Sequence, residues 1–352
     1  MIYCELDPKP EFYITSMRVL SAITLPVDLF GIYCIISKSP PVMRNYSFLL
    51  LFYQVFATIT DSWTNLMFIP VSFFPFPIAY HEGLLLSGVD VDISYMHVIW
   101  FCLVVSTMGS VVQLFIFRWQ NVLLDSHPLK VNRKYMYAIC STIFVLFNVG
   151  IVVQGQNMKN LANELRPQYL QNYSCIASIV DIPGLQYFAR EELRTLFLIG
   201  TSEAFVVVIS SFTLVYLTFR NLRNANLSKK TIEMQKRFQK SLMIQVTIPL
   251  LIVIIPGCSV MSVVWMGDFR SVGSFVLVIQ NGINVALFMI GTHGFIGTII
   301  MIIVNEPYRR FVVDTLKKSQ CMCHIRKVEP SRRLSMDPIH HQSRRQTLPI
   351  EA

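Results

Sequence analysis

Seven long apolar stretches restrict the fold of this chain more than any other feature of its sequence. A helix needs about 17–25 mostly apolar residues to cross the hydrocarbon core of a bilayer, and each stretch reaches that length. Only 14% of the 352 residues are charged, whereas soluble domains carry about 25%. The sequence therefore predicts an all-α membrane protein, a seven-transmembrane helix bundle. The predicted spans are Ile14–Ile36, Tyr46–Pro70, Ser94–Phe117, Met136–Val153, Thr195–Phe219, Ser241–Trp265 and Phe275–Val304.

The apolar stretches are predicted to be helices rather than strands of a membrane barrel. Barrel strands alternate apolar and polar residues along segments of about 10 residues. The run Ile248–Ile255 shows no such alternation, since it contains no polar residue.

Lysine and arginine are distributed unequally between the connecting segments, and this predicts the orientation. The segments after the first, third, fifth and seventh spans hold 23 basic residues, and the other connecting segments with the N-terminus hold six. Cytoplasmic segments of membrane proteins carry the excess of basic residues. We therefore expect the N-terminus outside and the C-terminus in the cytoplasm. The same distribution explains the net charge of +9 without a nucleic-acid partner.

Beyond the last span, the sequence predicts a short helix on the membrane surface. Pro307 suits the first turn of a helix. Tyr308, Phe311 and Leu316 then fall on one face, next to basic side chains that suit lipid headgroups. The predicted organisation is an extracellular N-terminus (1–13), a transmembrane domain (14–304), a juxtamembrane amphipathic helix (305–320) and a disordered basic tail (321–352).

Polar side chains in the outer half of the bundle suggest a ligand pocket. A charged residue near the middle of a membrane helix costs about 2.5–3.5 kcal/mol, so Glu203 should face the interior of the bundle. Other polar or aromatic residues are expected at a similar depth, and their convergence would form a ligand site. The alternative is that they are hydrogen-bond partners between helices. The candidates are His97, Glu203, Trp265, Gln280, Asn281 and Asn284.

A second group of residues inside the spans is expected to have a structural or switching role. Asp61 and Asn65 lie on one helix face at the i, i+4 spacing. Two prolines interrupt the sixth span, where each removes a backbone hydrogen bond and can bend the helix. The candidates are Asp28, Asp61, Asn65, Pro249, Pro256 and His293.

Several sequence blocks, each in its proper span, resemble one receptor family. The first span contains Pro26–Ile36, and the second contains Asp61 followed by the proline-rich stretch Pro70–Pro77. The most specific blocks are Leu227–Pro256 and His293–Arg309. The chain resembles the nematode serpentine chemoreceptors of class H (Srh), within the Str group of seven-helix receptors. The resemblance implies a G-protein-coupled receptor (GPCR) for small chemicals, in the plasma or ciliary membrane of sensory neurons.

One segment departs from the family pattern, at the inner end of the third span. The family usually has a Phe-Glu-Asn-Arg-like run there, whereas this chain has Phe117–Asn121, without the acidic residue and with the arginine displaced to position 118. We expect the surface that meets a heterotrimeric G protein to combine this end with the basic fifth loop and the helix at Pro307. The expected residues are Arg118, Lys236, Arg237, Pro307, Tyr308 and Arg309.

Cys175, in the long fourth loop, has two candidate disulfide partners. Cys4 lies in the other segment predicted to be extracellular, where disulfides form. Cys102 would give the helix-to-loop bridge seen in many receptors of this type, but it lies about 12 Å inside its helix. The pairing Cys4–Cys175 is favoured for this reason.

Five further positions are candidate modification sites. Asn172 begins the one Asn-x-Ser sequence that is predicted to lie outside, and could carry a glycan. Cys321 and Cys323 follow the juxtamembrane helix and suit palmitoylation, since too few ligands accompany them for a metal site. Ser335 and Thr347 follow paired arginines, as in kinase sites, although a solvated basic tail explains these arginines equally well.

A chemosensory receptor is the first functional hypothesis, and no cofactor is expected. A transporter or channel is the alternative, but the sequence lacks the internal repeat that many transporters show. A receptor that no longer couples to a G protein is a further alternative because of the altered third span. An intramembrane serine enzyme is the third hypothesis, and depth argues against it: Ser202 and His293 should differ in depth by about 15 Å, whereas a nucleophile and its base lie within about 3 Å.

Overall fold

The chain divides into a helical bundle, which ends at Tyr308, and a second unit that begins at Arg309. The structure is a computed structural model that describes residues 4–84, 92–124, 126–158, 160–224, 228–265 and 275–328. The two units are described separately.

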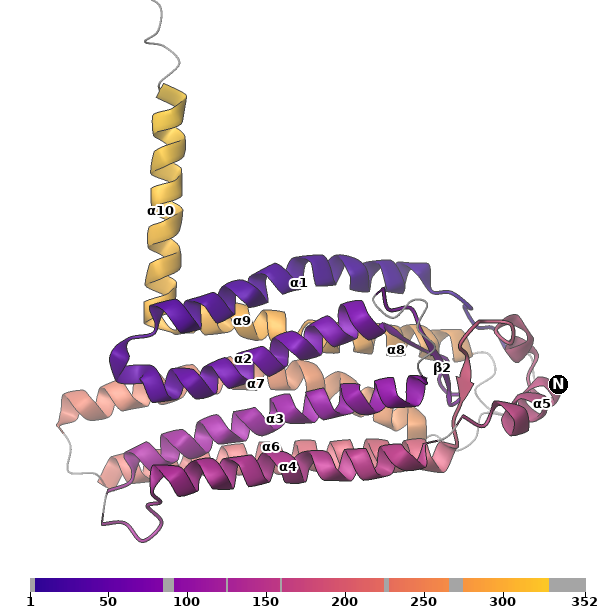
Figure 1. The fold of residues 1–352 in the computed structure, drawn as a ribbon, viewed down its shortest axis with the longest axis horizontal. Helices are drawn as coiled ribbons and strands as arrows, with labels where there is room; N and C mark the ends of the chain where they lie inside the picture. Colours follow the sequence, from indigo (N-terminus) through magenta and orange to yellow (C-terminus); the bar gives the residue numbers. More distant parts are fainter. Residues whose placement is uncertain are drawn as a thin grey trace, which may run out of the picture. The chain divides into compact units, whose positions relative to one another are not determined.

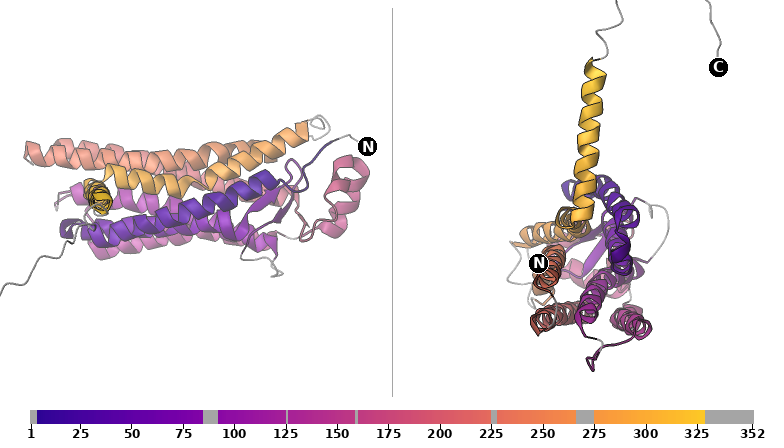
Figure 2. Two further views of the ribbon diagram at one scale, coloured as in Figure 1. Left: turned by 90° about the horizontal axis from the view of Figure 1, so that it is seen from above. Right: turned by 90° about the vertical axis from the view of Figure 1, so that its left-hand side faces the viewer.

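Long helices run side by side along the bundle (Figures 1 and 2). Within the described residues, six helical segments are long and apolar enough to cross a bilayer. The shorter α2 (Arg44–Ser62), which follows the turn η1 (Pro41–Met43), packs against α1 and α3 as the seventh. The predicted seven-helix fold is thereby confirmed. The six segments are α1 (Glu11–Lys38), α3 (Ile93–Val122), α4 (Arg133–Asn157), α6 (Arg190–Asn224), α7 (Lys229–Trp265) and the pair α8 (Val276–Ile290) with α9 (His293–Val304).

A β-hairpin follows α2, where the sequence analysis expected the end of a helix. The π-helical turn η2 (Trp63–Phe68) ends the second span, and β1 (Pro70–Ser72) and β2 (Ile78–His81) form the hairpin. The second span therefore does not reach Pro70, because Ile69 adopts a left-handed conformation with φ 39°. Such a conformation is unfavourable for a β-branched residue and turns the backbone out of the helix.

The hairpin is a buried connection, although loops normally run over the surface. Every residue from Phe68 to Tyr80 is buried. Its backbone groups remain paired because β1 and β2 are antiparallel, with Val71 opposite Tyr80, and β3 (Gln186–Tyr187) pairs with the outer edge of β2. At its base, a side chain on Gly83 would overlap the Met67 carbonyl, so glycine is required there.

The long connection between α4 and α6 lies next to this sheet. It contains α5 (Ala162–Asn172), the turn η3 (Ser174–Ser178) and β3. The Leu161 amide donates to the Tyr187 carbonyl at 2.8 Å, which closes the connection on itself. The end of the bundle that carries the sheet is called the sheet end below. The end that carries η1, the α3–α4 connection and the start of α7 is called the opposite end.

The predicted last span is interrupted. α8 ends at Ile290 and α9 begins at His293, with a turn at Gly291 and Thr292. The helix α10 (Glu306–Val328) begins in the first unit, and its part in the second unit continues past Gln320, where the juxtamembrane helix was predicted to end.

Candidate functional site

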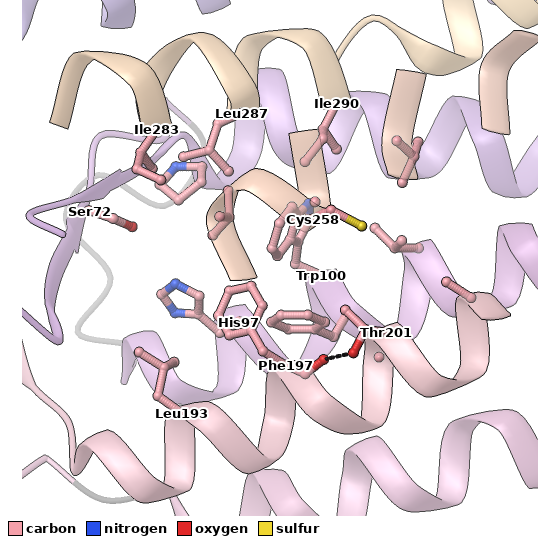
Figure 3. A pocket seen from close by; sticks show the side chains of 18 of the residues that line it. Ser72, His97, Trp100, Leu193, Phe197, Thr201, Cys258, Ile283, Leu287 and Ile290 are labelled. Carbon is pink, nitrogen blue, oxygen red and sulfur yellow. Dashed lines mark hydrogen bonds between the residues drawn. The ribbon is translucent and has the colours of Figure 1, made fainter. Parts of the chain in front are cut away.

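An apolar cavity lies inside the bundle next to the hairpin. Its volume is about 280 Å³, and α3, α6, α7, α8 and the hairpin contribute to its wall. Aromatic side chains dominate one side, with Trp100 and Phe101 on α3 and Phe197 on α6. Figure 3 shows His97, Trp100 and Phe197 across the cavity from the α8 residues Ile283, Leu287 and Ile290. A cavity of this shape suits a small, largely apolar molecule.

Few polar atoms line the cavity, and two of them are already bonded. Trp100 Nε1 donates to Thr64 Oγ1 at 2.9 Å, and Thr201 Oγ1 donates to the Phe197 carbonyl at 2.8 Å. His97 Nδ1 lies 3.0 Å from the Ile93 carbonyl and must donate to it, which leaves Nε2 as an acceptor in the neutral ring. A bound molecule would therefore find one strong hydrogen-bond acceptor in a mainly apolar wall, with Ser72 and Cys258 as weaker partners.

The six predicted ligand residues do not converge on this cavity, and His97 alone among them lines it. The Glu203 carboxylate points toward α4, where Oε1 lies 3.7 Å from the position of a Cβ on Gly150. Trp265 is 50% exposed, with its ring 5.6 Å from the Arg194 guanidinium, and Asn281 is exposed. These residues do not meet because depth along a helix does not determine which side of the helix a residue faces.

Gln280 and Asn284 are buried in α8, but neither side chain lines the cavity. The Gln280 side chain bonds both backbone groups of Asp7, accepting from its amide at 2.9 Å and donating to its carbonyl at 2.8 Å. Asn284 is 5% exposed, and its Oδ1 has no hydrogen-bond partner among the described residues. Gln280 therefore anchors the N-terminal segment to α8.

The break between α8 and α9 is held by polar side chains of the second span. Asp61 accepts from the Phe295 amide at 3.0 Å and from the Gly294 amide at 3.4 Å, so it caps the N-terminus of α9 from another helix. The Asp61 carboxylate also lies 2.8 Å from Nδ1 of His293. Asn65 Nδ2 donates to the Gly291 carbonyl at 2.7 Å. The approach is so close that a side chain on Gly294 would overlap the Asp61 carboxylate.

Asp28 lies near this network and has fewer partners. It accepts a hydrogen bond from Thr298 Oγ1, which in turn accepts from Gln54 Nε2 at 2.6 Å. The second carboxylate oxygen of Asp28 is buried and has no partner among the described residues. Pro249 and Pro256 are both buried in α7, which continues as a helix through both positions.

At the opposite end, Arg118 lies against aromatic rings. Its guanidinium is 3.5 Å from the centroid of the Phe238 ring and 5.8 Å from that of Tyr46, distances typical of cation–π interactions. Arg118 Nη2 also donates to Gln235 Oε1 at 3.4 Å. Because Tyr46 lies on α2 and Phe238 on α7, this aromatic cage (Tyr46, Arg118 and Phe238) joins three helices.

The other residues expected to meet a G protein lie near this cage or in the second unit. Lys236 and Arg237 are exposed on α7, and Pro307 is half-buried at the start of α10. Tyr308 is buried, with its hydroxyl 2.8 Å from Ser39 Oγ. Arg309 is exposed in the second unit.

Covalent features gather at the sheet end. Cys4 forms a disulfide bond with Cys175, with a Cα–Cα distance of 5.1 Å, and Cys102 is not bonded. Asn172 is exposed at the end of α5.

Burial lowers the pKa of His81, at the end of β2, below its usual value of 6.5, so this ring is uncharged at neutral pH.

Four predicted modification sites lie beyond what the structure describes. Ser335 and Thr347 fall within residues 329–352, outside the described residues. Cys321 and Cys323 lie in α10, but their side chains are outside the described part.

Comparisons with known proteins agree with this architecture. The crystal structure of squid rhodopsin superposes with a TM-score of 0.58, covering 91% of this chain and 89% of that chain at 9% identity, which shows the seven-helix fold. Serpentine receptor class H-72 of Caenorhabditis elegans is 21% identical over an alignment of 333 residues, which covers 89% of this chain and 90% of that receptor. Family and fold are those of receptors and not of enzymes.

The family model described as "Serpentine type 7TM GPCR chemoreceptor Srh" matches residues 8–318. The match includes every helix of the bundle and the hairpin, so the similarity extends over the whole membrane domain. The chain is therefore a member of the Srh family of serpentine chemoreceptors, multi-pass integral membrane proteins of the GPCR class.

Proposed function

We propose that this receptor binds a small, mainly apolar chemical in the cavity and signals through a heterotrimeric G protein at the opposite end of the bundle. The observation that carries the proposal is the wall of the cavity, which is apolar except for His97 and a few weaker groups. We place the receptor in the plasma or ciliary membrane of a sensory neuron, with the sheet end outside.

Two features support this orientation. The connecting segments at the opposite end hold most of the basic residues between the helices, as cytoplasmic segments do. The Cys4–Cys175 disulfide lies at the sheet end, and disulfides form in oxidising compartments such as the outside of the cell.

Signalling requires that a ligand bind one helix arrangement more tightly than another. α7 is suited to link the two ends because Leu251 and Val260 line the cavity, while Phe238 of the same helix touches Arg118. Pro249 lies between these positions and removes one backbone hydrogen bond of α7. A ligand that shifts the outer part of α7 would thereby loosen the aromatic cage.

Filling the cavity should weaken the response to chemicals without removing the receptor from the membrane. Ala204 lines the cavity on α6, and Ala204→Trp places an indole in the space that a ligand would occupy. We expect the half-maximal concentration of any activating chemical to rise by about tenfold or more, which corresponds to about 1.4 kcal/mol of lost binding energy. The measurement is a calcium or cyclic-nucleotide reporter in cells exposed to a panel of volatile and water-soluble chemicals.

The control is Val206→Trp on the same helix. Val206 is 54% exposed and does not line the cavity, so its response should match that of the wild type at equal surface amount. Equal responses from the Ala204→Trp and wild-type receptors would contradict the use of this cavity.

The aromatic cage should restrain activity in the absence of ligand. Phe238→Leu removes the ring beneath Arg118 and with it a cation–π interaction worth about 2 kcal/mol when desolvated. We expect ligand-independent signalling to rise several-fold, because the inner ends of α3 and α7 are then less tightly joined. The measurement is the basal reporter signal, normalised to receptor at the cell surface.

Phe219→Leu provides the comparison for this effect. It removes a half-buried ring from α6 near the same end, outside the aromatic cage. If both variants gave the same basal signal as the wild type, the aromatic cage would have no restraining role.

A further inference from the structure

The wall of the cavity is not equally thick on all sides. The residues contributed by α8 and the hairpin are buried, with Ile283 3% and Ile78 1% exposed. On the side of α6 and α7, in contrast, some residues both line the cavity and face the outside of the bundle. Phe205 is 63% and Leu251 47% exposed, and Cys258 is exposed as well.

These exposed wall residues lie deep within the membrane spans. Cys258 and Leu251 are about 10 and 21 Å from the end of α7 at Trp265, at about 1.5 Å per residue. Both depths fall within a hydrocarbon core about 30 Å thick. The neighbouring exposed residues Val206 and Ile255 are apolar, as expected for a surface in contact with lipid. Figure 3 shows Cys258 of α7 and Thr201 of α6 on the two sides of the cavity.

The sheet end offers a less direct route to the cavity within the described part of the chain. The hairpin residues Ser72, Phe74 and Ile78 form the wall on that side, and each is buried. β3 pairs with the hairpin from outside, and the disulfide ties η3 to the N-terminal segment. A molecule arriving along the bundle axis would have to displace a paired sheet.

We propose that ligands reach the cavity sideways from the bilayer, through a side opening between α6 and α7 whose rim is formed by Phe205, Leu251, Gly257 and Cys258. This inference rests on the proposed use of the cavity as the ligand site. It also specifies the ligand class: neutral, apolar molecules that dissolve in the membrane first. Each added methylene raises their concentration in lipid about fourfold, at about 0.8 kcal/mol, so the bilayer concentrates them next to the opening.

Gly257 gives a direct way to narrow the side opening. It lines the cavity, yet a Cβ added there would meet no heavy atom within 4 Å. A larger side chain therefore enters open space and does not disturb the packing of α7. Gly282 on α8 has the same free space but does not line the cavity, so it is a matched control.

The test uses full-length receptor in phosphatidylcholine vesicles and a neutral photoprobe, 3-trifluoromethyl-3-phenyldiazirine. Receptor and probe are mixed by stopped flow and exposed to a light pulse after increasing delays. Mass spectrometry then quantifies labelling of Leu287, which is 5% exposed and lines the far wall of the cavity. A derivative with a permanent trimethylammonium charge serves as the probe that cannot dissolve in lipid.

In the Gly257→Trp receptor, we expect the rate of Leu287 labelling to fall about tenfold, because the indole raises the barrier to passage through the side opening. The final level of labelling should equal that of the wild type. Gly257→Leu should slow it less, and Gly282→Trp should not slow it. The charged derivative should not label Leu287. Equal thermal unfolding of all variants would show that each is folded.

Two kinds of failure can be distinguished. Unchanged labelling rates in Gly257→Trp, or labelling of Leu287 by the charged derivative, would overturn the side opening and leave the cavity as the ligand site. A lower final level at an unchanged rate would mean that the tryptophan fills the cavity, which also overturns a role in passage. If the neutral probe never labels Leu287 in the wild type, both this inference and the proposed function are wrong.

Discussion

Replacing Asp61 by alanine is expected to destabilise the folded receptor by about 3–5 kcal/mol, because each buried donor that loses its acceptor costs about 1–3 kcal/mol. Asp61 is 1% exposed and accepts from three donors, the amides of Gly294 and Phe295 and Nδ1 of His293. The substitution leaves the two amides at the N-terminus of α9 buried without their acceptor, and leaves Nδ1 of His293 with only the Ile290 carbonyl, 2.9 Å away. The measurement is the unfolding midpoint of purified receptor in detergent.

Asp28→Ala is the matched comparison, since Asp28 is also 1% exposed. It has one partner, Thr298, and one oxygen with no partner among the described residues, so its loss should cost about 1 kcal/mol or less. His293→Ala should combine non-additively with Asp61→Ala, with a coupling energy of about 0.5–3 kcal/mol. Additive effects, or equal effects of the two aspartate variants, would show that Asp61 does not hold the break together.

Removing the disulfide is the second substitution with a large expected effect. Cys4→Ser should lower the free energy of unfolding by about 2–5 kcal/mol, because the bond closes a long loop and restricts the unfolded chain. The sequence separation of the two cysteines is 171 residues. After the substitution, the two hydrogen bonds between Asp7 and Gln280 remain to hold the N-terminal segment against α8. Thermal unfolding with and without a reducing agent measures the effect.

Cys102→Ser is the control for this experiment because Cys102 is not bonded. The Cys102→Ser receptor should remain sensitive to the reducing agent, whereas the Cys4→Ser receptor should not. The opposite result would mean that Cys175 pairs with Cys102.

The seven spans were predictable because lipid imposes a composition on every helix that crosses it. The hairpin was not, because the stretch Pro70–Pro77 is as apolar as the span before it. Hydropathy reports burial and cannot distinguish a membrane helix from a strand buried within the bundle. The signals that could have identified the hairpin are the three prolines of this stretch and the Gly83 that closes its base.

The candidate site was less predictable than the fold, and for a different reason. Polar residues attract attention in a membrane span, but this cavity is walled by Phe101, Phe197 and Leu287, which look like ordinary core residues. Depth along a helix can be counted from the sequence, whereas the face that a residue presents depends on how the helices rotate against each other. Glu203 was placed at a suitable depth and faces α4 instead of the cavity.

The interruption at Gly291 and Thr292 divides one span into two helices, and only the first of them lines the cavity within the described residues. α8 contributes Ile283, Leu287 and Ile290 to the cavity, whereas α9 packs against α1, α2 and α7 and contributes none of the cavity's described lining. Under the proposed function, substitutions in α8 should alter chemical preference while α9 keeps its contacts with the other helices. Exchanging α8 between two such receptors, with α9 left unchanged, should then exchange their chemical preferences.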